Sequence, residues 1–357
     1  MPEKVLVAMS GGVDSSVAAK VLIEQGYCCE GAIMCLHHGS TSVNENSDIL
    51  DAENVCNNLG IGFNVLDKRA EFKENVVNSF INDYIAGLTP NPCVVCNKTM
   101  KFASFLQSAN ALGCQKIATG HYARIKYNTN TNRYELLKAK DQTKDQSYFL
   151  YFLSQEVLAK TLFPLGEYTK AEIRQMAQNS DFENAHKKDS QDICFVPDGN
   201  YAEFIQNNCG KGLESGVFTD KNGKVLGENK GIIHYTIGQR KGLGIALGKP
   251  QFVLSKNAQN NTVVLGDEQD LFYKYVKVNN VNFISVPDIT EPTKAEVKLR
   301  YAAKPQPATI RKTEGGVIVE FEEPQRAPSA GQAAVFYVND SVLGGGIISE
   351  AFNSLQE

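Results

Sequence analysis

The start of the chain alternates between apolar runs and helical periodicity. An apolar segment at residues 4–9 ends in a turn of glycine and serine, and residues 13–25 then repeat apolar positions at helical spacing up to Gly26. Residues 30–37 form a second apolar segment, which is typical of a buried strand. The pattern therefore predicts a strand–helix–strand unit.

The same alternation continues to about residue 120. It predicts helix 48–59, strand 63–67, helix 70–86, helix 102–112 and strand 116–120. Strands that alternate with helices form a parallel sheet covered on both faces, which is the doubly wound α/β class, and ligands bind at the carboxyl ends of its strands. The turn after the first strand, Met34 and the pair Gly120 and His121 all lie at such ends.

The second half of the chain changes character. A surface hairpin is predicted at residues 127–137, and Thr169 with Glu172 forms a capping box that opens a helix. Helical periodicity largely stops near residue 208, and from residue 216 short strands alternate with Gly, Asn and Pro turns. We expect an α/β domain at 1–200, followed by two smaller, mainly-β domains at 201–270 and 271–357.

Composition and charge limit the function classes. The chain has 357 residues, of which 42% are hydrophobic and 21% charged, an average globular composition. Its apolar runs fall short of the roughly 20 residues that a membrane span needs, so we expect a cytoplasmic protein with no membrane partner. The net charge of -4 argues against general coating of nucleic acid but allows local basic tracks. Such tracks lie around Lys98 and Lys101, around Lys187 and Lys188, and at residues 234–241.

The turn after the first strand reads Ser10-Gly11-Gly12-Val13-Asp14-Ser15. Glycines let backbone amides approach phosphate oxygens, and the start of the following helix attracts anions. Because no Gly-Lys-Ser/Thr follows, no Walker A lysine reaches the outer phosphates, and transfer of the terminal phosphate is disfavoured. An ordinary turn in which Ser and Asp cap the helix is the alternative. The turn resembles the pyrophosphate loop (PP-loop) of the N-type ATP pyrophosphatases, which implies that Asp14 lies near Mg²⁺ or the pyrophosphate.

Two cysteines, Cys93 and Cys96, lie one helical turn apart and follow a pair of prolines. We expect a stiffened loop just before a helix, in which the helix start and Lys98 lower the pKa of both thiols. Cys194 is a third candidate, whose link to the pair the sequence leaves open. Half of a zinc site is the alternative for the pair, although the chain has no second Cys-x-x-Cys or His-x-His. The other six of the nine cysteines are expected to be structural, and a disulfide framework is not expected.

The PP-loop, the Asn-Pro-Cys-x-x-Cys-Asn-Lys segment at 91–98 and the Ser-Gln-Asp-Ile-Cys-Phe segment at 190–195 occur in this order. In these features the chain resembles the bacterial tRNA-specific 2-thiouridylases over nearly its whole length. Further matching segments are 120–123, 144–150, 238–243, 300–301 and 330–333. The resemblance implies a PP-loop ATPase domain for adenylation and thiolation at 1–200, a central β-rich tRNA-binding domain at 201–270 and a C-terminal β-barrel at 271–357.

The resemblance also implies roles for individual residues. Cys194 matches the cysteine that receives sulfur as a persulfide, and Cys96 matches the nucleophile that attacks the persulfide or the thiolated adduct and leaves a Cys96–Cys194 disulfide. Asp14 completes the implied catalytic set. ATP contacts are implied for Ala8, Met9, Ser10, Gly11, Gly12, Val13, Asp14, Ser15, Met34 and Gly120. Contacts with the target base are implied for Asn91, Pro92 and Cys93, and other tRNA contacts for His121, Lys144, Asp145, Gln146, Arg300, Tyr301 and Gln332.

The implied reaction depends on ATP. A uridine 2-carbonyl oxygen is a poor leaving group, so its adenylation converts it into AMP, which a sulfur nucleophile then displaces. Mg²⁺ would neutralise the pyrophosphate, and the wobble uridine would have to flip out of the anticodon stack. The implied partners are tRNA and a sulfur donor, which is a sulfur-relay protein or a cysteine desulfurase. An acidic protein can bind tRNA through shape and local basic tracks.

One position departs from the family pattern. Many family members have Asp where this chain has Cys93, so either a Cys93 thiolate replaces that carboxylate or the proton transfer lies elsewhere. Cys93, Cys96 and Cys194 could alternatively be three ligands of an iron–sulfur cluster, and apart from this alternative no resident metal site is predicted. The remaining alternatives are another PP-loop ligase, such as a lysidine-type tRNA ligase or a small-metabolite synthetase, and a non-catalytic nucleotide- or metal-binding module.

Overall fold

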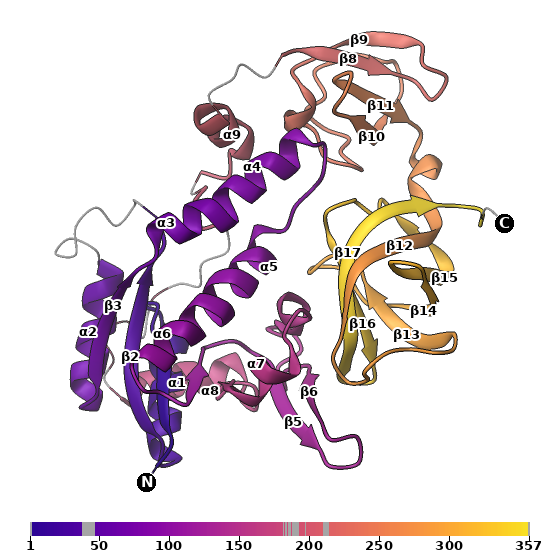
Figure 1. Cartoon of the computed structure of the whole chain (residues 1–357). Helices are drawn as coiled ribbons and strands as arrows, with labels where there is room; N and C mark the ends of the chain where they lie inside the picture. Colours follow the sequence, from indigo (N-terminus) through magenta and orange to yellow (C-terminus); the bar gives the residue numbers. More distant parts are fainter. Residues whose placement is uncertain are drawn as a thin grey trace.

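The computed structural model describes residues 2–37, 47–180, 182, 184, 187, 193–196, 198–209 and 214–355. Figure 1 shows an α/β part that carries the N-terminus, a small β part at the upper end and a barrel that carries the C-terminus. The predicted fold class, a doubly wound parallel sheet followed by two mainly-β parts, is confirmed.

A five-stranded parallel sheet forms the α/β part, with the strand order β3-β2-β1-β4-β7. Its strands are β1 (Lys4–Ala8), β2 (Cys28–Cys35), β3 (Gly62–Asp67), β4 (Lys116–Ala118) and β7 (Thr161–Leu162). Helices cover both faces, which is why β1 is a continuous apolar run with Val5, Leu6 and Val7 fully buried. The strand order reverses between β1 and β4, so the carboxyl ends of these two strands flank the crevice where such sheets bind ligands.

The first helices agree with the sequence prediction. Helix α1 (Val13–Glu24) follows β1, and α2 (Ser47–Leu59) precedes β3. A longer helical run then consists of α3 (Arg69–Phe72), the π-helical stretch η1 (Lys73–Val77) and α4 (Asn78–Ile85), which agrees with the predicted helix 70–86.

The helix that carries the cysteine pair differs from the prediction. It consists of α5 (Pro92–Cys96), the π-helical stretch η2 (Asn97–Ser104) and α6 (Phe105–Ala111), and we call this run the thiol helix. It begins at Pro92 and not at residue 102, so both cysteines lie in the helix, and the prediction of a preceding loop was wrong. The reason is local: Pro92 takes the first helical position, and the Asn91 side chain accepts a hydrogen bond from the Val94 N–H.

Shorter elements complete the α/β part. Strands β5 (Arg124–Asn128) and β6 (Arg133–Leu137) form the predicted hairpin, and β6 touches the barrel sheet through the pair Leu137 and Ser341. Next come the 3-10 helix η3 (Ser147–Leu150), α7 (Gln155–Ala159), α8 (Lys170–Gln178) and α9 (Tyr201–Cys209). The predicted capping box of Thr169 and Glu172 is present at the start of α8.

The small β part is a four-stranded sheet with the order β10-β11-β8-β9. Its strands are β8 (Gly216–Thr219), β9 (Val225–Asn229), β10 (Phe252–Asn257) and β11 (Thr262–Gly266), and the 3-10 helix η5 (Ile232–His234) lies between β9 and β10. A further 3-10 helix, η6 (Glu268–Leu271), leads into the barrel.

Six antiparallel strands form the C-terminal barrel. They are β12 (Phe272–Phe283), β13 (Thr293–Lys298), β14 (Gln306–Thr313), β15 (Gly316–Arg326), β16 (Ala333–Val338) and β17 (Ser341–Phe352). The pairing of β12 with β17 closes the barrel, which agrees with the predicted β-barrel.

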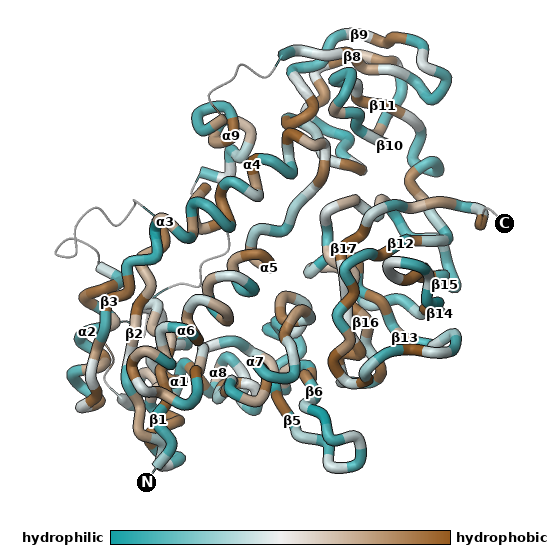
Figure 2. The backbone as a smooth tube through the Cα atoms, viewed as in Figure 1, coloured by the Kyte–Doolittle hydropathy of each residue, from teal (hydrophilic) through white to brown (hydrophobic). Residues whose placement is uncertain are grey.

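Hydrophobic clusters extend across the three parts. One cluster contains Phe102 of the thiol helix together with Val335 of the barrel, and another contains Cys96 together with Val253 of the small β part. Figure 2 shows hydrophobic positions on the thiol helix and on the strands around it. The thiol helix is therefore the element whose surroundings draw on all three parts.

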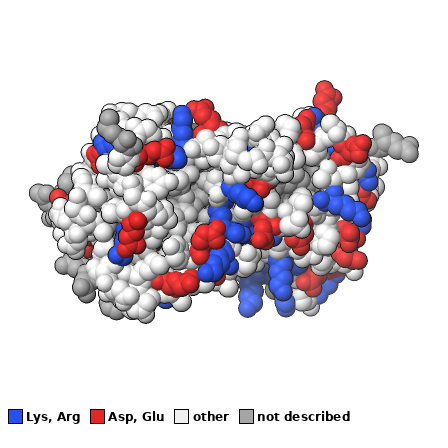
Figure 3. All heavy atoms as spheres, turned by 90° about the horizontal axis from the view of Figure 1, so that it is seen from below, with Lys and Arg blue, Asp and Glu red and all other residues white. Residues whose placement is uncertain are grey.

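The surface bears charges of both signs. On the face seen in Figure 3, basic and acidic side chains are interspersed, and several basic groups gather near the middle. Among the described residues, every helix is too short or too polar to cross a bilayer.

Candidate functional site

The loop between β1 and α1 has the geometry that the sequence predicted. Gly11 adopts a φ of +68°, and a Cβ at this position would lie 2.5 Å from the Asp48 carbonyl oxygen, so only glycine fits. The Ser15 hydroxyl accepts a hydrogen bond from the Ser10 N–H at 3.1 Å and donates one to the Gly12 carbonyl oxygen at 2.9 Å. Gly12 is the N-cap of α1, and this helix has no side-chain cap. The alternative in which Ser and Asp only cap the helix is therefore wrong, and no side chain of the described residues caps the first N–H groups of α1, which can bind an anion.

Asp14 is held by two residues that the sequence prediction missed. The Lys170 ammonium lies 2.8 Å from each Asp14 carboxylate oxygen, and the Tyr122 hydroxyl donates to Oδ1 at 2.7 Å. Lys170 is the first residue of α8 and only 7% exposed, so its charge is fixed beside the loop. The loop therefore has a lysine beside it that is supplied from a distant part of the chain.

Met34 and Gly120 lie at the carboxyl ends of the two strands that neighbour β1, as predicted. Met34 is in β2, and Gly120 follows β4. A Cβ at Gly120 would lie 3.1 Å from the backbone carbon of Asp14 and from the Ser15 nitrogen. Gly120 therefore has to be glycine so that the segment after β4 can pack against the start of α1.

His121 continues this segment toward the thiol helix. Its Nδ1 lies 2.7 Å from the Thr119 hydroxyl, and its ring packs against Phe102 with 5.7 Å between the centroids. Burial lowers the pKa of His121 well below its ordinary value, and the nearby Lys101 charge lowers it further. The imidazole is therefore neutral at neutral pH and joins the end of β4 to the thiol helix.

Three thiols, those of Cys93, Cys96 and Cys194, lie near one another. Cys96 is buried and Cys93 exposed on the thiol helix, and Cys194 is exposed. Charges on Cys93 and Cys194 each raise the pKa of Cys96, so the three sulfurs are close enough to interact electrostatically. The ring of Phe195, next to Cys194, packs at 5.4 Å from Phe80, and both rings share a cluster with Cys96. The link between Cys194 and the pair, which the sequence left open, is thus present as proximity.

The expected direction of the thiol pKa shifts was wrong. Burial raises the pKa of Cys96 to about 11. Although Cys93 and Cys194 reach the surface, the protein atoms packed around their thiols desolvate them and raise their pKa as well. The charge that opposes these shifts is that of Lys101, whereas the exposed Lys98 does not contribute. None of the nine cysteines, all of which are described, forms a disulfide.

The cysteine cluster does not have the arrangement of a metal site. In the part of the chain that the structure describes, no three His, Cys, Asp or Glu side chains lie close enough together to hold a metal ion. Cys93, Cys96 and Cys194 are all described, and they do not form such a group. Two acidic residues lie at the glycine loop: Asp14 belongs to it, and Asp48, whose carboxylate binds Lys187, packs against Gly11.

The residues implied in tRNA contact fall into two neighbouring groups. In the first, Asp145 is buried and accepts hydrogen bonds from Ala139 N–H and from the Ser147 hydroxyl. The Gln146 side chain accepts from the Tyr122 N–H at 2.9 Å, which ties the turn that also carries Lys144 to Tyr122, the residue whose hydroxyl binds Asp14.

The second group belongs to the barrel. The Tyr301 ring packs 4.5 Å from the Phe149 ring, which brings the turn after β13 next to residues 144–150. Arg300 donates to the Ala327 carbonyl oxygen at 2.6 Å. The Gln332 amide donates to the Thr89 carbonyl oxygen at 2.8 Å and thereby reaches the segment just before Asn91.

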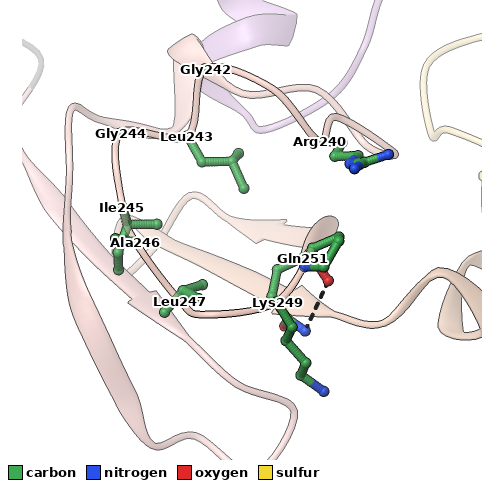
Figure 4. Close-up of a pocket in the computed structure, with 10 residues that line it drawn as sticks. Arg240, Gly242, Leu243, Gly244, Ile245, Ala246, Leu247, Lys249 and Gln251 are labelled. Carbon is green, nitrogen blue, oxygen red and sulfur yellow. Dashed lines mark hydrogen bonds between the residues drawn. The ribbon is translucent and has the colours of Figure 1, made fainter.

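A pocket of about 470 Å³ lies in the small β part. It is lined by the glycine-rich segment 240–251, which includes part of the basic track singled out in the sequence. Figure 4 shows the side chains of Leu243, Ile245 and Leu247 on one side and the cationic ends of Arg240 and Lys249 at its edge. Lys249 is paired with Asp267 at 2.8 Å.

A doubly wound sheet with a glycine loop at its switch point is the architecture of a nucleotide-binding domain. The family described as tRNA methyl transferase HUP domain matches residues 3–198, which is more than half of the chain. The tRNA methyl transferase PRC-barrel domain matches residues 202–267, and the aminomethyltransferase beta-barrel domain matches residues 273–348.

The chain belongs to the tRNA-specific 2-thiouridylase family. It is 47% identical to tRNA-specific 2-thiouridylase MnmA of Clostridioides difficile, over 98% of this chain and 99% of that protein. It is 48% identical to the protein of the same name in Acetivibrio thermocellus, over 97% of this chain and 99% of that one. A solved 4-thiouridine synthetase–RNA complex with bound ATP covers 57% of this chain and 50% of its own, with 15% identity and a TM-score of 0.36, which is too distant to argue from.

Proposed function

We propose that this protein is a tRNA uridine 2-sulfurtransferase. It adenylates the 2-carbonyl oxygen of a wobble uridine with ATP and then replaces that oxygen with sulfur, giving 2-thiouridine, AMP and pyrophosphate. The observation that carries the proposal is the connection, through Gly120 and His121, between the glycine loop and a helix with two thiols beside a third. Similarity to 2-thiouridylases over nearly the whole chain supports it.

In the first half-reaction the 2-carbonyl oxygen attacks the α-phosphorus of ATP, and the bond to the β-phosphate breaks. Residues 8–15 with Met34 and Gly120 contact ATP in this proposal, and the free N–H groups at the start of α1 bind phosphate oxygens. Lys170 brings the positive charge that a Walker A lysine would supply, because Asp14 holds its ammonium next to the loop.

Magnesium fits the loop as a partner of bound ATP. Mg²⁺ commonly combines one or two carboxylates with substrate phosphates and water, and Asp14 is the carboxylate that the loop offers. When bound there, it would neutralise charge on the departing pyrophosphate. Asp14 would then share its charge between Lys170 and the metal.

In the second half-reaction the terminal sulfur of a Cys194 persulfide attacks C2 of the adenylated uridine, and AMP leaves with the former carbonyl oxygen. The Cys96 thiolate then attacks the Cys194 Sγ. The bond between this Sγ and the sulfur on C2 breaks, the sulfur stays on the base, and a Cys96–Cys194 disulfide forms. A dithiol reductant resets both thiols. A sulfur-relay protein or a cysteine desulfurase supplies the persulfide sulfur to Cys194.

The environment of the thiols suits a sulfur relay that becomes reactive only when tRNA changes the surroundings of the thiols. Since burial raises the pKa of Cys96 to about 11, the free protein holds it as an unreactive thiol at neutral pH. Cys93 stands where many relatives carry an acid and faces the target base together with Asn91 and Pro92. With its thiol largely protonated, Cys93 serves as a proton donor and not as a base.

The tRNA is bound by all three domains in this proposal, namely the adenylation and thiolation domain at 1–200, the central domain at 201–270 and the barrel at 271–357. His121, Lys144, Asp145, Gln146, Arg300, Tyr301 and Gln332 contact tRNA outside the target base. All nine cysteines are reduced, which is consistent with a reducing, cytoplasmic setting.

The test is mass spectrometry of nucleosides from unmodified tRNA after incubation with the protein, ATP, Mg²⁺ and a persulfide donor, namely a cysteine desulfurase with cysteine. The expected product is uridine in which one sulfur replaces one oxygen, and its formation requires ATP. Asp14→Asn should remove both AMP and thiolated product. Formation of a lysine or amide adduct, or ATP consumption without sulfur in the tRNA, would assign the chain to a different PP-loop reaction.

A further inference from the structure

Residues 86–90 link α4 to the thiol helix, and we call this link the strap. Figure 1 shows the chain rising along α4 to the small β part and returning past the barrel into α5. Gly87 adopts a φ of +82°, and the Leu88 N–H bonds to the Asp83 carbonyl oxygen at 2.9 Å, which is a regular helix end. The strap is therefore held firmly at its first residues.

The small β part holds the strap from one side. The Lys256 ammonium on β10 donates to the Leu88 carbonyl oxygen at 3.3 Å and lies 5.7 Å from the centre of the Tyr84 ring. Tyr84 in turn stacks on Tyr201 at 5.0 Å. Burial lowers the pKa of Lys256 to about 8, which reflects how closely the protein encloses this ammonium.

The barrel holds the strap from the other side. The Thr89 N–H donates to the Ala330 carbonyl oxygen at 2.8 Å, and the Gln332 amide donates to the carbonyl oxygens of Thr89 at 2.8 Å and Pro90 at 3.3 Å. A Cβ at Gly331 would lie 3.1 Å from Thr89 N and O, and Gly331 has a φ of +92°. Glycine at this position is therefore what lets the barrel loop approach the strap.

The contacts continue in both directions along the chain. On the barrel side, the Arg300 guanidinium donates to the Ala327 carbonyl oxygen at 2.6 Å and to the Ser329 hydroxyl at 3.3 Å, directly before Ala330. On the other side, Pro90 is followed at once by Asn91, whose side chain caps the thiol helix. A shift of either β part thus reaches the first turn of the helix that carries Cys93.

We propose that the strap is the positioning element through which tRNA bound to the two β parts sets the place of Cys93 and Cys96. The inference rests on the proposed thiolation of tRNA and adds to it how substrate binding reaches the thiols. Lys256 acts through the Leu88 backbone and is a positioning residue, not a catalytic one. Hydrogen bonds hold the strap to both the small β part and the barrel. The thiol helix therefore responds to movements of both parts.

The experiment compares the wild type with Lys256→Met, Lys256→Arg and a matched control, Lys224→Met, which removes an exposed lysine of the same β part. Three quantities are measured on the full chain: the Kd for unmodified tRNA, the single-turnover thiolation rate, and the rate at which iodoacetamide alkylates Cys93 and Cys96 with and without tRNA. For Lys256→Met we expect a Kd within about twofold of wild type, a thiolation rate about tenfold lower, and loss of the tRNA-dependent change in alkylation. Lys256→Arg should retain the thiolation rate and the tRNA-dependent change in alkylation, and Lys224→Met should behave as wild type.

A second variant guards against misfolding of the first. Gly331→Ala places a methyl group against Thr89 from the barrel side and should likewise separate tRNA binding from the tRNA-dependent alkylation change. The proposal is overturned if tRNA alters alkylation equally in wild type and Lys256→Met, or if the tRNA Kd weakens in proportion to the rate. Absence of thiolation in the wild type would instead refute the proposed function, while the alkylation measurements would still decide the role of the strap.

Discussion

The two ends of the proposed active site are constructed differently. At the glycine loop, the residues that bind Asp14, Lys170 and Tyr122, belong to the same α/β part. The start of the thiol helix depends instead on Lys256 of the small β part and Gln332 of the barrel. The nucleotide end is thus complete within one part, whereas the thiol end is completed by the parts that we propose to bind tRNA.

The two ends also differ in charge: the nucleotide end carries charged groups, and the thiol end carries largely uncharged thiols. Asp14 is an ion-paired carboxylate in a loop that already presents N–H groups to an anion. The thiols are held with raised pKa, so at neutral pH they carry little charge. In the proposed function, the ATP site is therefore preformed in the free protein. The sulfur transfer requires a change in the surroundings of the thiols that lowers their pKa. Four substitutions test this separation.

The largest effect is expected for Cys96→Ser. Without its thiolate, no disulfide with Cys194 can form, so we expect thiolated tRNA to fall at least about a thousandfold, while ATP affinity stays within about twofold. Nucleoside mass spectrometry and ATP titration measure the two quantities. Cys28→Ser, at an exposed cysteine on β2, is the matched control and should retain activity. Retained thiolation in Cys96→Ser would remove this residue from the sulfur route.

The next largest effect is expected for Lys170→Met. Loss of the ammonium leaves Asp14 without its ion pair with Lys170 and removes one positive charge from the phosphate site, so pyrophosphate release should slow about a hundredfold. The alkylation rate of Cys96 should not change, because the thiol end is separate. Arg174→Met, an exposed cation on the same helix, serves as control. A change in Cys96 alkylation in the Lys170 variant would mean that the two ends are coupled without tRNA.

What the sequence could predict depended on how local each signal was. The parallel sheet, the glycine loop and the capping box of α8 are short contiguous patterns, and each was found where predicted. Lys170 was missed because it lies 156 residues from Asp14, and a lysine at a helix start gives no sign of its distant partner. The sequence does show a lysine at the first position of a capped helix, where the positive helix end disfavours a cation, and this mismatch could have drawn attention to Lys170.

The direction of the thiol pKa shifts was beyond the sequence for a different reason. A cysteine near a helix start and a lysine favours thiolate, but desolvation depends on tertiary packing, such as that of Phe195 on Phe80. The π-helical register after Cys96 also decides which lysine lies near the thiols, and it selects Lys101 over Lys98. Neither the packing nor the register leaves a mark in a single sequence.

Lys101→Met should have a smaller effect, confined to the thiol end. Because the Lys101 charge opposes the rise in the pKa of Cys96, its removal should move the alkylation profile of Cys96 upward by about one pH unit, which corresponds to about tenfold less thiolate at a given pH. Alkylation of the wild type should itself rise with pH toward about 11. ATP binding should be unaffected. Lys98→Met is the control, and an equal shift in that variant would contradict the role given to Lys101.

The smallest effect is expected for Tyr122→Phe, which probes how finely the nucleotide end is built. The variant removes one hydroxyl donor from Asp14 Oδ1 and leaves both Lys170 contacts in place. Since the Asp14 side chain is 32% exposed, water can replace the lost donor, and pyrophosphate release should slow only about threefold. Tyr122 also fixes Gln146 through its backbone N–H, which the substitution retains, so tRNA affinity should not change. If the variant instead weakens tRNA binding while pyrophosphate release is normal, Tyr122 belongs functionally to the tRNA-binding residues. Its contact with Asp14 would then not define the nucleotide end.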